Sequence, residues 1–275
     1  MWRRILVIAA LLVLAGCAEK GLEDRGDWIA DTRHPAEQAW PRVKVLVIHY
    51  TAGDFDRSLK TLTGEQVSAH YLIPANPPLR GDKPVIWQLV PEQQLAWHAG
   101  ISEWRGATRI NDTSIGIELE NAGYRMENGE KRYFPFPEGQ IAALSRVARD
   151  VITRYGIKPE NVVAHGDVAP QRKEDPGPLF PWQALAKQGI GAWPDANRVA
   201  FYLNGRSPDE PVDSAALLDL LARYGYQIPA NATAAQQQRV ISIFQMHFRP
   251  ARYDGKADAG SQAIAEALLE KYGQG

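Results

Sequence analysis

The sequence has a single cysteine, Cys17, among its 275 residues. One cysteine excludes an intramolecular disulfide and leaves no thiol elsewhere to bind a metal or act as a nucleophile. Basic residues are not in excess, with 31 Lys and Arg against 32 Asp and Glu, so composition does not indicate nucleic-acid binding. The chain also lacks a His-Glu-x-x-His motif. Any metal site must therefore use nitrogen and oxygen ligands brought together from distant parts of the sequence.

The N-terminal segment has the features of a signal peptide that ends at the cysteine. A basic start is followed by an almost entirely aliphatic run from Ile5 to Leu14, about 10 residues, well short of the ~20 needed to cross a bilayer. The run closes with Leu-Ala-Gly-Cys at 14–17, which resembles a bacterial lipobox. The resemblance implies removal of residues 1–16 and lipidation of Cys17. The alternative is an ordinary signal peptide that a cysteine happens to follow.

Residues 17–40 mix charged residues and glycine without periodicity, which indicates a tether. A larger section, 41–195, then alternates strand and helix patterns. Helical periodicity from Ile141 to Tyr155 ends at Gly156, a predicted C-cap. Apolar runs typical of strands occur at 43–48, 69–73, 85–90, 114–120 and 161–164. These patterns predict an α/β (α+β) fold, with a mixed central β-sheet flanked by helices.

The C-terminal part, 207–275, has a different character. A Ser-Pro-Asp-Glu-Pro stretch at 207–211 is typical of a linker. Helical patterns follow at 214–224, 234–248 and 260–272. The leucine and phenylalanine spacing, with Asp-Gly-Lys-Ala-Asp before the last helix, resembles the three-helix peptidoglycan-binding domain of cell-wall hydrolases. The alternative is any small helical bundle.

His49, His165 and Asp175 are the candidate metal ligands. Each histidine follows an apolar strand, where its side chain would be held rigidly, and Asp175 lies ten residues beyond the second histidine. A hydrolytic zinc site uses three protein ligands and leaves the fourth position for water. On spacing alone, a structural role explains each histidine better than a role as ligand.

Six ordered segments carry a family resemblance from Val45 to Trp182. They are Val-Ile-His-Tyr-Thr-Ala at 47–52, Ser-Ala-His-Tyr-Leu-Ile at 68–73, Ala-Trp-His-Ala-Gly at 96–100, Asn-Asp-Thr-Ser-Ile-Gly-Ile-Glu-Leu-Glu at 111–120, Val-Val-Ala-His-Gly-Asp at 162–167 and Gln-Arg-Lys-Glu-Asp-Pro-Gly-Pro-Leu-Phe-Pro-Trp at 171–182. Together they resemble the zinc-dependent N-acetylmuramoyl-L-alanine amidases, which are related to phage lysozyme-type amidases and to peptidoglycan recognition proteins. The section 41–195 is then expected to be the catalytic domain.

The resemblance implies a role for each matching residue. His49, His165 and Asp175 match the zinc ligands, so one Zn²⁺ is the expected cofactor. Glu118 matches a carboxylate near the attacking water, and burial in an apolar strand would raise its pKa toward that of a general base. Lys173 matches a basic residue that stabilises the oxyanion. The alternatives are Glu120 in place of Glu118, and an ordinary surface role for Lys173.

The loop 97–112 and a second strand contain further candidates. Trp97, His98 and Arg105 offer aromatic faces, an imidazole and a cation that could contact substrate, although each can equally serve packing. His70 is expected to be a group in the cleft wall rather than a ligand.

The resemblance implies hydrolysis of the amide between N-acetylmuramic acid and L-alanine in peptidoglycan or muropeptides, with no nucleic-acid partner. Two alternatives remain open at this point: a non-catalytic peptidoglycan-binding protein of the same fold, and a zinc peptidase acting within the stem peptide. Ala18 follows Cys17 where enteric lipoproteins retained in the inner membrane carry aspartate. For a Gram-negative source, we therefore expect a lipid anchor in the outer membrane facing the periplasm.

Overall fold

The computed structural model describes residues 20–273, in which the chain divides into two compact units, one ending at Trp40 and the other beginning at Pro41. In the first unit, β1 (Leu22–Asp24) and β2 (Ile29–Asp31) pair antiparallel, a small ribbon that composition did not predict. The predicted signal peptide and Cys17 lie outside the described residues. Within 20–273, no helix combines the length and apolarity that a membrane span requires.

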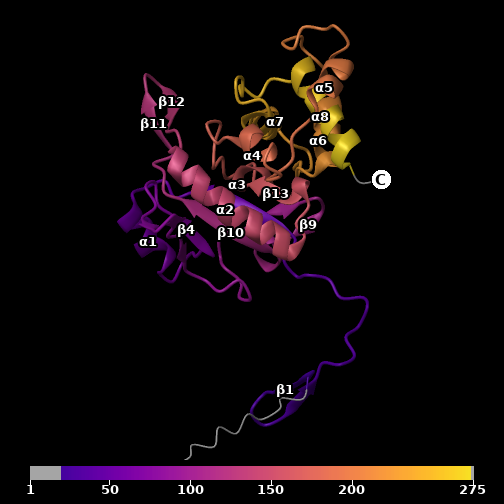
Figure 1. Ribbon diagram of the computed structural model, residues 1–275. Helices are drawn as coiled ribbons and strands as arrows, with labels where there is room; N and C mark the ends of the chain where they lie inside the picture. The colour runs from indigo at the N-terminus through magenta and orange to yellow at the C-terminus, as the bar shows by residue number, and fades with distance from the viewer. Residues whose placement is uncertain (1–19, 274–275) are drawn as a thin grey trace, which may run out of the picture. The chain divides into compact units, whose positions relative to one another are not determined.

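A five-stranded sheet forms the centre of the second unit, in the order β13-β3-β10-β4-β7 (Figure 1). β3, β10, β4 and β13 run parallel, while β7 pairs antiparallel with β4. The bounds are β3 (Val45–Tyr50), β4 (Tyr71–Ile73), β7 (Trp87–Gln88), β10 (Ser114–Leu119) and β13 (Val162–Ala164). The predicted mixed sheet with helices on it is confirmed. The predicted strand 85–90 is shorter because it pairs with only two residues of β4, Tyr71 and Leu72.

The two faces of the sheet are buried by different helices. Leu46 and Ile48 of β3 pack with α2 (Glu138–Tyr155), whose ribbon crosses the sheet in Figure 1. The alternating residues Val45 and Val47 point to the other face and join a core shared with the C-terminal helices. Burial on both faces explains why β3 is a continuous apolar run.

Helix ends follow the local sequence. Gly156 ends α2 in the left-handed conformation, with φ 64°, and donates its N–H to the carbonyl of Ile152, which confirms the predicted C-cap. Asp54 caps α1 (Phe55–Leu62), a helix that the periodicity did not predict. Thr233 and Gln236 form a capping box at the start of α7 (Ala234–Phe248).

Several short elements were not predicted from the sequence. The hairpin β11–β12 stands away from the main sheet in Figure 1. The bounds are β5 (Leu79–Arg80), β6 (Lys83–Pro84), β8 (Glu103–Trp104), β9 (Ala107–Thr108), β11 (Tyr124–Glu127), β12 (Glu130–Tyr133), and the 3₁₀ turns Ile110–Thr113 and Pro159–Asn161.

The three predicted C-terminal helices are present as α6 (Ser214–Tyr224), α7 and α8 (Ala259–Tyr272). The sequence analysis missed α5 (Ala196–Leu203), which packs along α8. Helix α7 packs against α3 (His165–Val168) and α4 (Trp182–Ala186). Because the helices share one compact unit with the sheet, the division into domains 41–195 and 207–275 stays a prediction.

Candidate metal centre

Three candidate ligands converge where two parallel strands end. His49 lies in β3, His165 directly follows the adjacent strand β13, and Asp175 returns through the segment 166–175. The N–H of Gly166 donates to the carbonyl of Asp175 at 3.0 Å, which closes this segment. The Nδ1 atoms of the two histidines lie 2.9 Å apart, and Asp175 Oδ2 lies 3.1 Å from His165 Nδ1 and 3.3 Å from His49 Nδ1. All three side chains are buried.

The outer nitrogen of each histidine has a partner that orients the ring. His165 Nε2 lies 3.3 Å from the carbonyl oxygen of Ala99, which can only accept, so this nitrogen carries the proton. His49 Nε2 lies 3.0 Å from Nδ1 of His98, to which we assign it as the donor. Both Nδ1 lone pairs then face Asp175, as expected of metal-binding imidazoles held by outer partners.

The protonation states also suit a metal. Burial and the charge of His165 lower the pKa of His49 to about 4, so this ring is neutral at pH 7. Burial alone would raise the pKa of Asp175, but His165 and His49 outweigh it and hold the carboxyl ionised. Two imidazoles and one carboxylate form the ligand set of a hydrolytic zinc site. The separations of 2.9 to 3.3 Å approach the roughly 3.3 Å between ligands that share one tetrahedral zinc.

Glu118 lies beside this cluster on the neighbouring strand. It pairs in register with His49, and its Oε1 lies 4.0 Å from His49 Nδ1. Burial raises the pKa of Glu118 to about 8, with repulsion from Asp175 adding to the effect and the charge of Lys173 opposing it. Its Oε2 is buried without a hydrogen-bond partner among the described residues. An unpaired buried carboxyl oxygen beside the ligands is suited to exchanging a proton with a bound water.

Glu120 and Lys173 differ in their availability for chemistry. The carboxylate of Glu120 accepts hydrogen bonds from the backbone N–H groups of Phe55 and Ala75, so it is engaged in holding the start of α1 and the segment at Ala75. The half-buried Lys173 lowers the pKa of both His49 and Glu118, which places its positive charge within electrostatic reach of the centre.

His98 lies within the protein rather than on its surface. Its Nδ1 contacts His49, and its Nε2 lies 3.0 Å from Ser114 Oγ. The close approach of its ring to β10 requires Gly116, where a Cβ would lie 2.5 Å from the ring. A glycine inside an apolar strand signals such an approach, and the sequence analysis did not use it. Both ring nitrogens of His70 are also hydrogen-bonded within the protein, because its Nδ1 accepts from the N–H of Gly116 and its Nε2 donates to the carbonyl oxygen of Gln94.

Of the three predicted substrate contacts, only Trp97 is exposed, with 54% of its surface accessible. Together with Ile101 and Arg172, it lines a cleft of about 440 Å³. Arg105 donates instead to the carbonyl oxygens of Tyr224 and Tyr272 and thereby joins the loop to the C-terminal helices.

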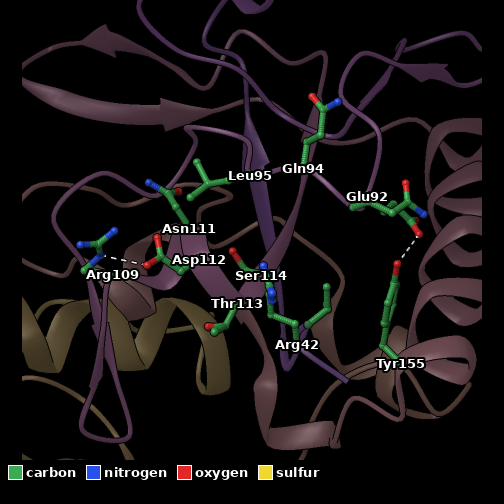
Figure 2. A pocket seen from close by; sticks show the side chains of 12 residues that line it. Arg42, Glu92, Gln94, Leu95, Arg109, Asn111, Asp112, Thr113, Ser114 and Tyr155 are labelled. Carbon is green, nitrogen blue, oxygen red and sulfur yellow. Dashed lines mark hydrogen bonds and ion pairs between the residues drawn. The ribbon is translucent and has the colours of Figure 1, made fainter. Parts of the chain in front are cut away.

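A larger cavity of about 650 Å³ lies at the other end of the sheet, where β3 and β10 begin (Figure 2). Ser114 is in its wall and connects it through His98 to His49. On one side Tyr155 donates to Glu92, an interaction drawn in Figure 2. Arg154 also pairs with Glu92 and holds the pKa of that carboxyl at about 2, although burial opposes this shift.

Comparison with known proteins identifies a family and a relative that matches the chain over its full length. Residues 39–178 match the family described as N-acetylmuramoyl-L-alanine amidase. The chain is 66% identical over 275 residues to the N-acetylmuramoyl-L-alanine amidase AmiD of Escherichia coli (strain K12), covering all of both chains.

Two solved structures resemble the fold over most of the chain. A complex of E. coli AmiD with the substrate anhydro-N-acetylmuramic acid-L-Ala-D-γ-Glu-L-Lys has a TM-score of 0.90 at 67% identity, covering 94% of this chain and 100% of that one. AmpDh3 from Pseudomonas aeruginosa, in complex with anhydromuramic pentapeptide, has a TM-score of 0.81 at 40% identity, with coverage of 92% and 99%.

Proposed function

The chain belongs to the N-acetylmuramoyl-L-alanine amidase family and is an enzyme of that kind, and on this premise we propose that it works with a zinc ion held by His49, His165 and Asp175. The observation that carries the proposal is the buried N,N,O cluster with the unpaired oxygen of Glu118 beside it. The scissile bond is the amide between the lactyl group of N-acetylmuramic acid and L-alanine, so the products are a stem peptide and a peptide-free sugar.

The proposed substrates are muropeptides and peptidoglycan. The AmiD and AmpDh3 complexes contain anhydromuramic peptides, and both structures resemble this chain over more than nine-tenths of its length. The exposed face of Trp97 is available for contact with sugar or peptide.

The chain's own residues supply the proton transfers and the orientation. When bound, zinc supplies Lewis-acid chemistry that makes a water nucleophilic near neutral pH and polarises the amide carbonyl. Glu118 accepts the proton of the attacking water and passes it to the leaving amine of L-alanine. The ammonium of Lys173 stabilises the charge that develops on the carbonyl oxygen. His98 and the carbonyl of Ala99 hold the two ligand rings in orientation.

The proposed location is the outer membrane, on the periplasmic side, through a lipid on Cys17. Its support is the Leu-Ala-Gly-Cys sequence at 14–17 and the Ala18 that follows. The C-terminal helices are proposed to bind peptidoglycan, which would keep the tethered enzyme on its substrate. Metabolic labelling with a palmitate analogue should label the wild-type chain and leave Cys17→Ala unlabelled. Equal labelling of both would contradict the proposed lipid anchor on Cys17.

Product masses test the reaction and the metal together. The purified mature chain is incubated with muropeptides, with and without a chelator and with zinc added back. We expect free stem peptides and peptide-free sugar, lost with chelator and restored by zinc. Cleavage within the stem peptide would indicate a peptidase, and activity that survives complete metal removal would contradict the zinc proposal.

A further inference from the structure

The segment from His165 to Asp175 carries two of the three candidate ligands and Lys173, yet most of it is irregular. Besides the single turn of α3 and the closing bond from Gly166 to Asp175, the backbone bonds within it are those from Ala169, Arg172 and Lys173 to nearby carbonyls. A segment with so little secondary structure of its own needs outside contacts to hold its side chains in place. Those contacts come largely from helix α7 and its flanks.

Arg239 of α7 contacts three points of this segment. Its Nε donates to the carbonyl oxygen of Pro170 and its Nη2 to that of Lys173, both at 3.1 Å. Its Nη1 lies 3.1 Å from Oε2 of Glu174, the buried residue next to Asp175. One planar guanidinium therefore connects the residues on both sides of the turn that leads into the ligand.

The same carboxylate is also held by a second cation. Lys131, on the hairpin β11–β12, contacts both oxygens of Glu174 at 2.6 Å. Two cations from separate elements thus balance one buried anion, which fixes its position more tightly than either cation alone.

The beginning of the segment is also held by C-terminal residues. Asp167, two residues after His165, accepts hydrogen bonds from the hydroxyl of Tyr226 and from Nδ1 of His247, both at 2.7 Å. At Gly166, an added Cβ would lie 3.3 Å from the side chain of Ile243 on α7, so the helix approaches the backbone closely there.

We propose that helix α7 is a structural part of the metal centre and that Arg239 is a positioning residue for Lys173 and Asp175. The inference rests on the proposed zinc-dependent function. It extends that function, because it gives the C-terminal helices a role in positioning the metal centre in addition to the proposed binding of peptidoglycan. Loss of Arg239 would free the turn before Asp175 without removing any ligand. Outer partners of metal ligands typically contribute about 10- to 100-fold in metal affinity or activity.

The test compares Arg239→Ala and Arg239→Lys with the control Arg252→Ala in the mature chain. Arg252 lies in the same C-terminal section, but its partners are Asp209 and Asp254. Three readouts are taken: amide hydrogen exchange of residues 168–175 in metal-free protein, zinc affinity by competition with a chelator, and kcat and KM on a muropeptide.

In Arg239→Ala we expect the backbone amide hydrogens of Arg172 and Lys173 to exchange faster than in wild type. Zinc should bind about 10- to 100-fold more weakly, and kcat should fall by a similar factor while KM stays within about twofold of the wild-type value. Arg239→Lys should recover part of each loss, and Arg252→Ala should match wild type. If Arg239→Ala fails to fold, Arg239→Lys carries the same comparison with smaller changes.

Wild-type exchange and zinc affinity in a folded Arg239→Ala would overturn the positioning role, as would wild-type values in Arg239→Lys if the alanine variant does not fold. Failure of the wild-type chain itself to bind zinc would instead overturn the metal proposal, so the two failures are distinguishable. In that case, faster amide hydrogen exchange in metal-free Arg239→Ala would still show that Arg239 orders the segment.

Discussion

Replacing Gly116 with alanine tests how closely His98 is packed behind the metal centre. The added Cβ would lie 2.5 to 2.7 Å from three atoms of the His98 ring, a separation that cannot be sustained. The ring cannot move freely, because its two nitrogens contact His49 and Ser114 and its backbone N–H donates to Asn111. Either the ring shifts and loses hydrogen bonds, or β10 is displaced.

The expected cost follows from those contacts. Overpacking a core costs about 1–3 kcal/mol, and weakening one or two hydrogen bonds adds about 1 kcal/mol each. We therefore expect Gly116→Ala to destabilise metal-free protein by about 2–5 kcal/mol, or about 4–20 °C in Tm for a unit of this size. Since His98 orients His49, zinc affinity should also fall by about 10- to 100-fold.

The assay is thermal unfolding followed by circular dichroism, in wild-type and His98→Ala backgrounds. With the ring removed, the extra methyl group has space, so Gly116→Ala should cost less than about 1 kcal/mol there. Gly139→Ala in α2 is the matched control, because nothing lies near its added Cβ, and it should be neutral or slightly stabilising. Equal destabilisation by Gly116→Ala in both backgrounds would refute the role of His98.

Four further predictions concern charged groups. Glu118→Gln should lower kcat by about 10²- to 10⁴-fold while zinc binding is retained, as measured by steady-state kinetics and metal analysis. Because the folded pKa of Glu118 is raised from 4.5 to about 8, metal-free wild type should lose about 5 kcal/mol of unfolding free energy as pH rises through this interval, and Glu118→Gln should not. Glu92 has a folded pKa lowered to about 2, so its contribution, about 1–2 kcal/mol after solvent screening, is present above pH 4.5 and is lost as pH falls toward 2; urea titration of Glu92→Gln should show a smaller acid dependence. Asp175→Ala should abolish zinc binding and turnover but leave muropeptide binding measurable by calorimetry; full activity would exclude Asp175 as a ligand.

Local pattern was sufficient for much of the fold. The apolar run of β3 and the helical period of α2 predicted elements that the structure contains, because each pattern reflects burial of a face. The short helices α1 and α5 and the hairpin β11–β12 were missed. Elements of this length depend on a cap or a few tertiary contacts rather than on a sustained period.

The sequence by itself determined the chemistry available to this protein. The absence of a second cysteine restricts ligands in the body of the chain to nitrogen and oxygen, and apolar strands place histidines where they are rigid and Glu118 where it is desolvated. Tertiary structure alone decided which residues contact these side chains and hold them in place. His98 faces His49 because Gly116 leaves room for its ring, and Arg105 and Arg239 contact carbonyls more than sixty residues away. Such pairings depend on how whole elements pack against each other, and no local periodicity records that packing.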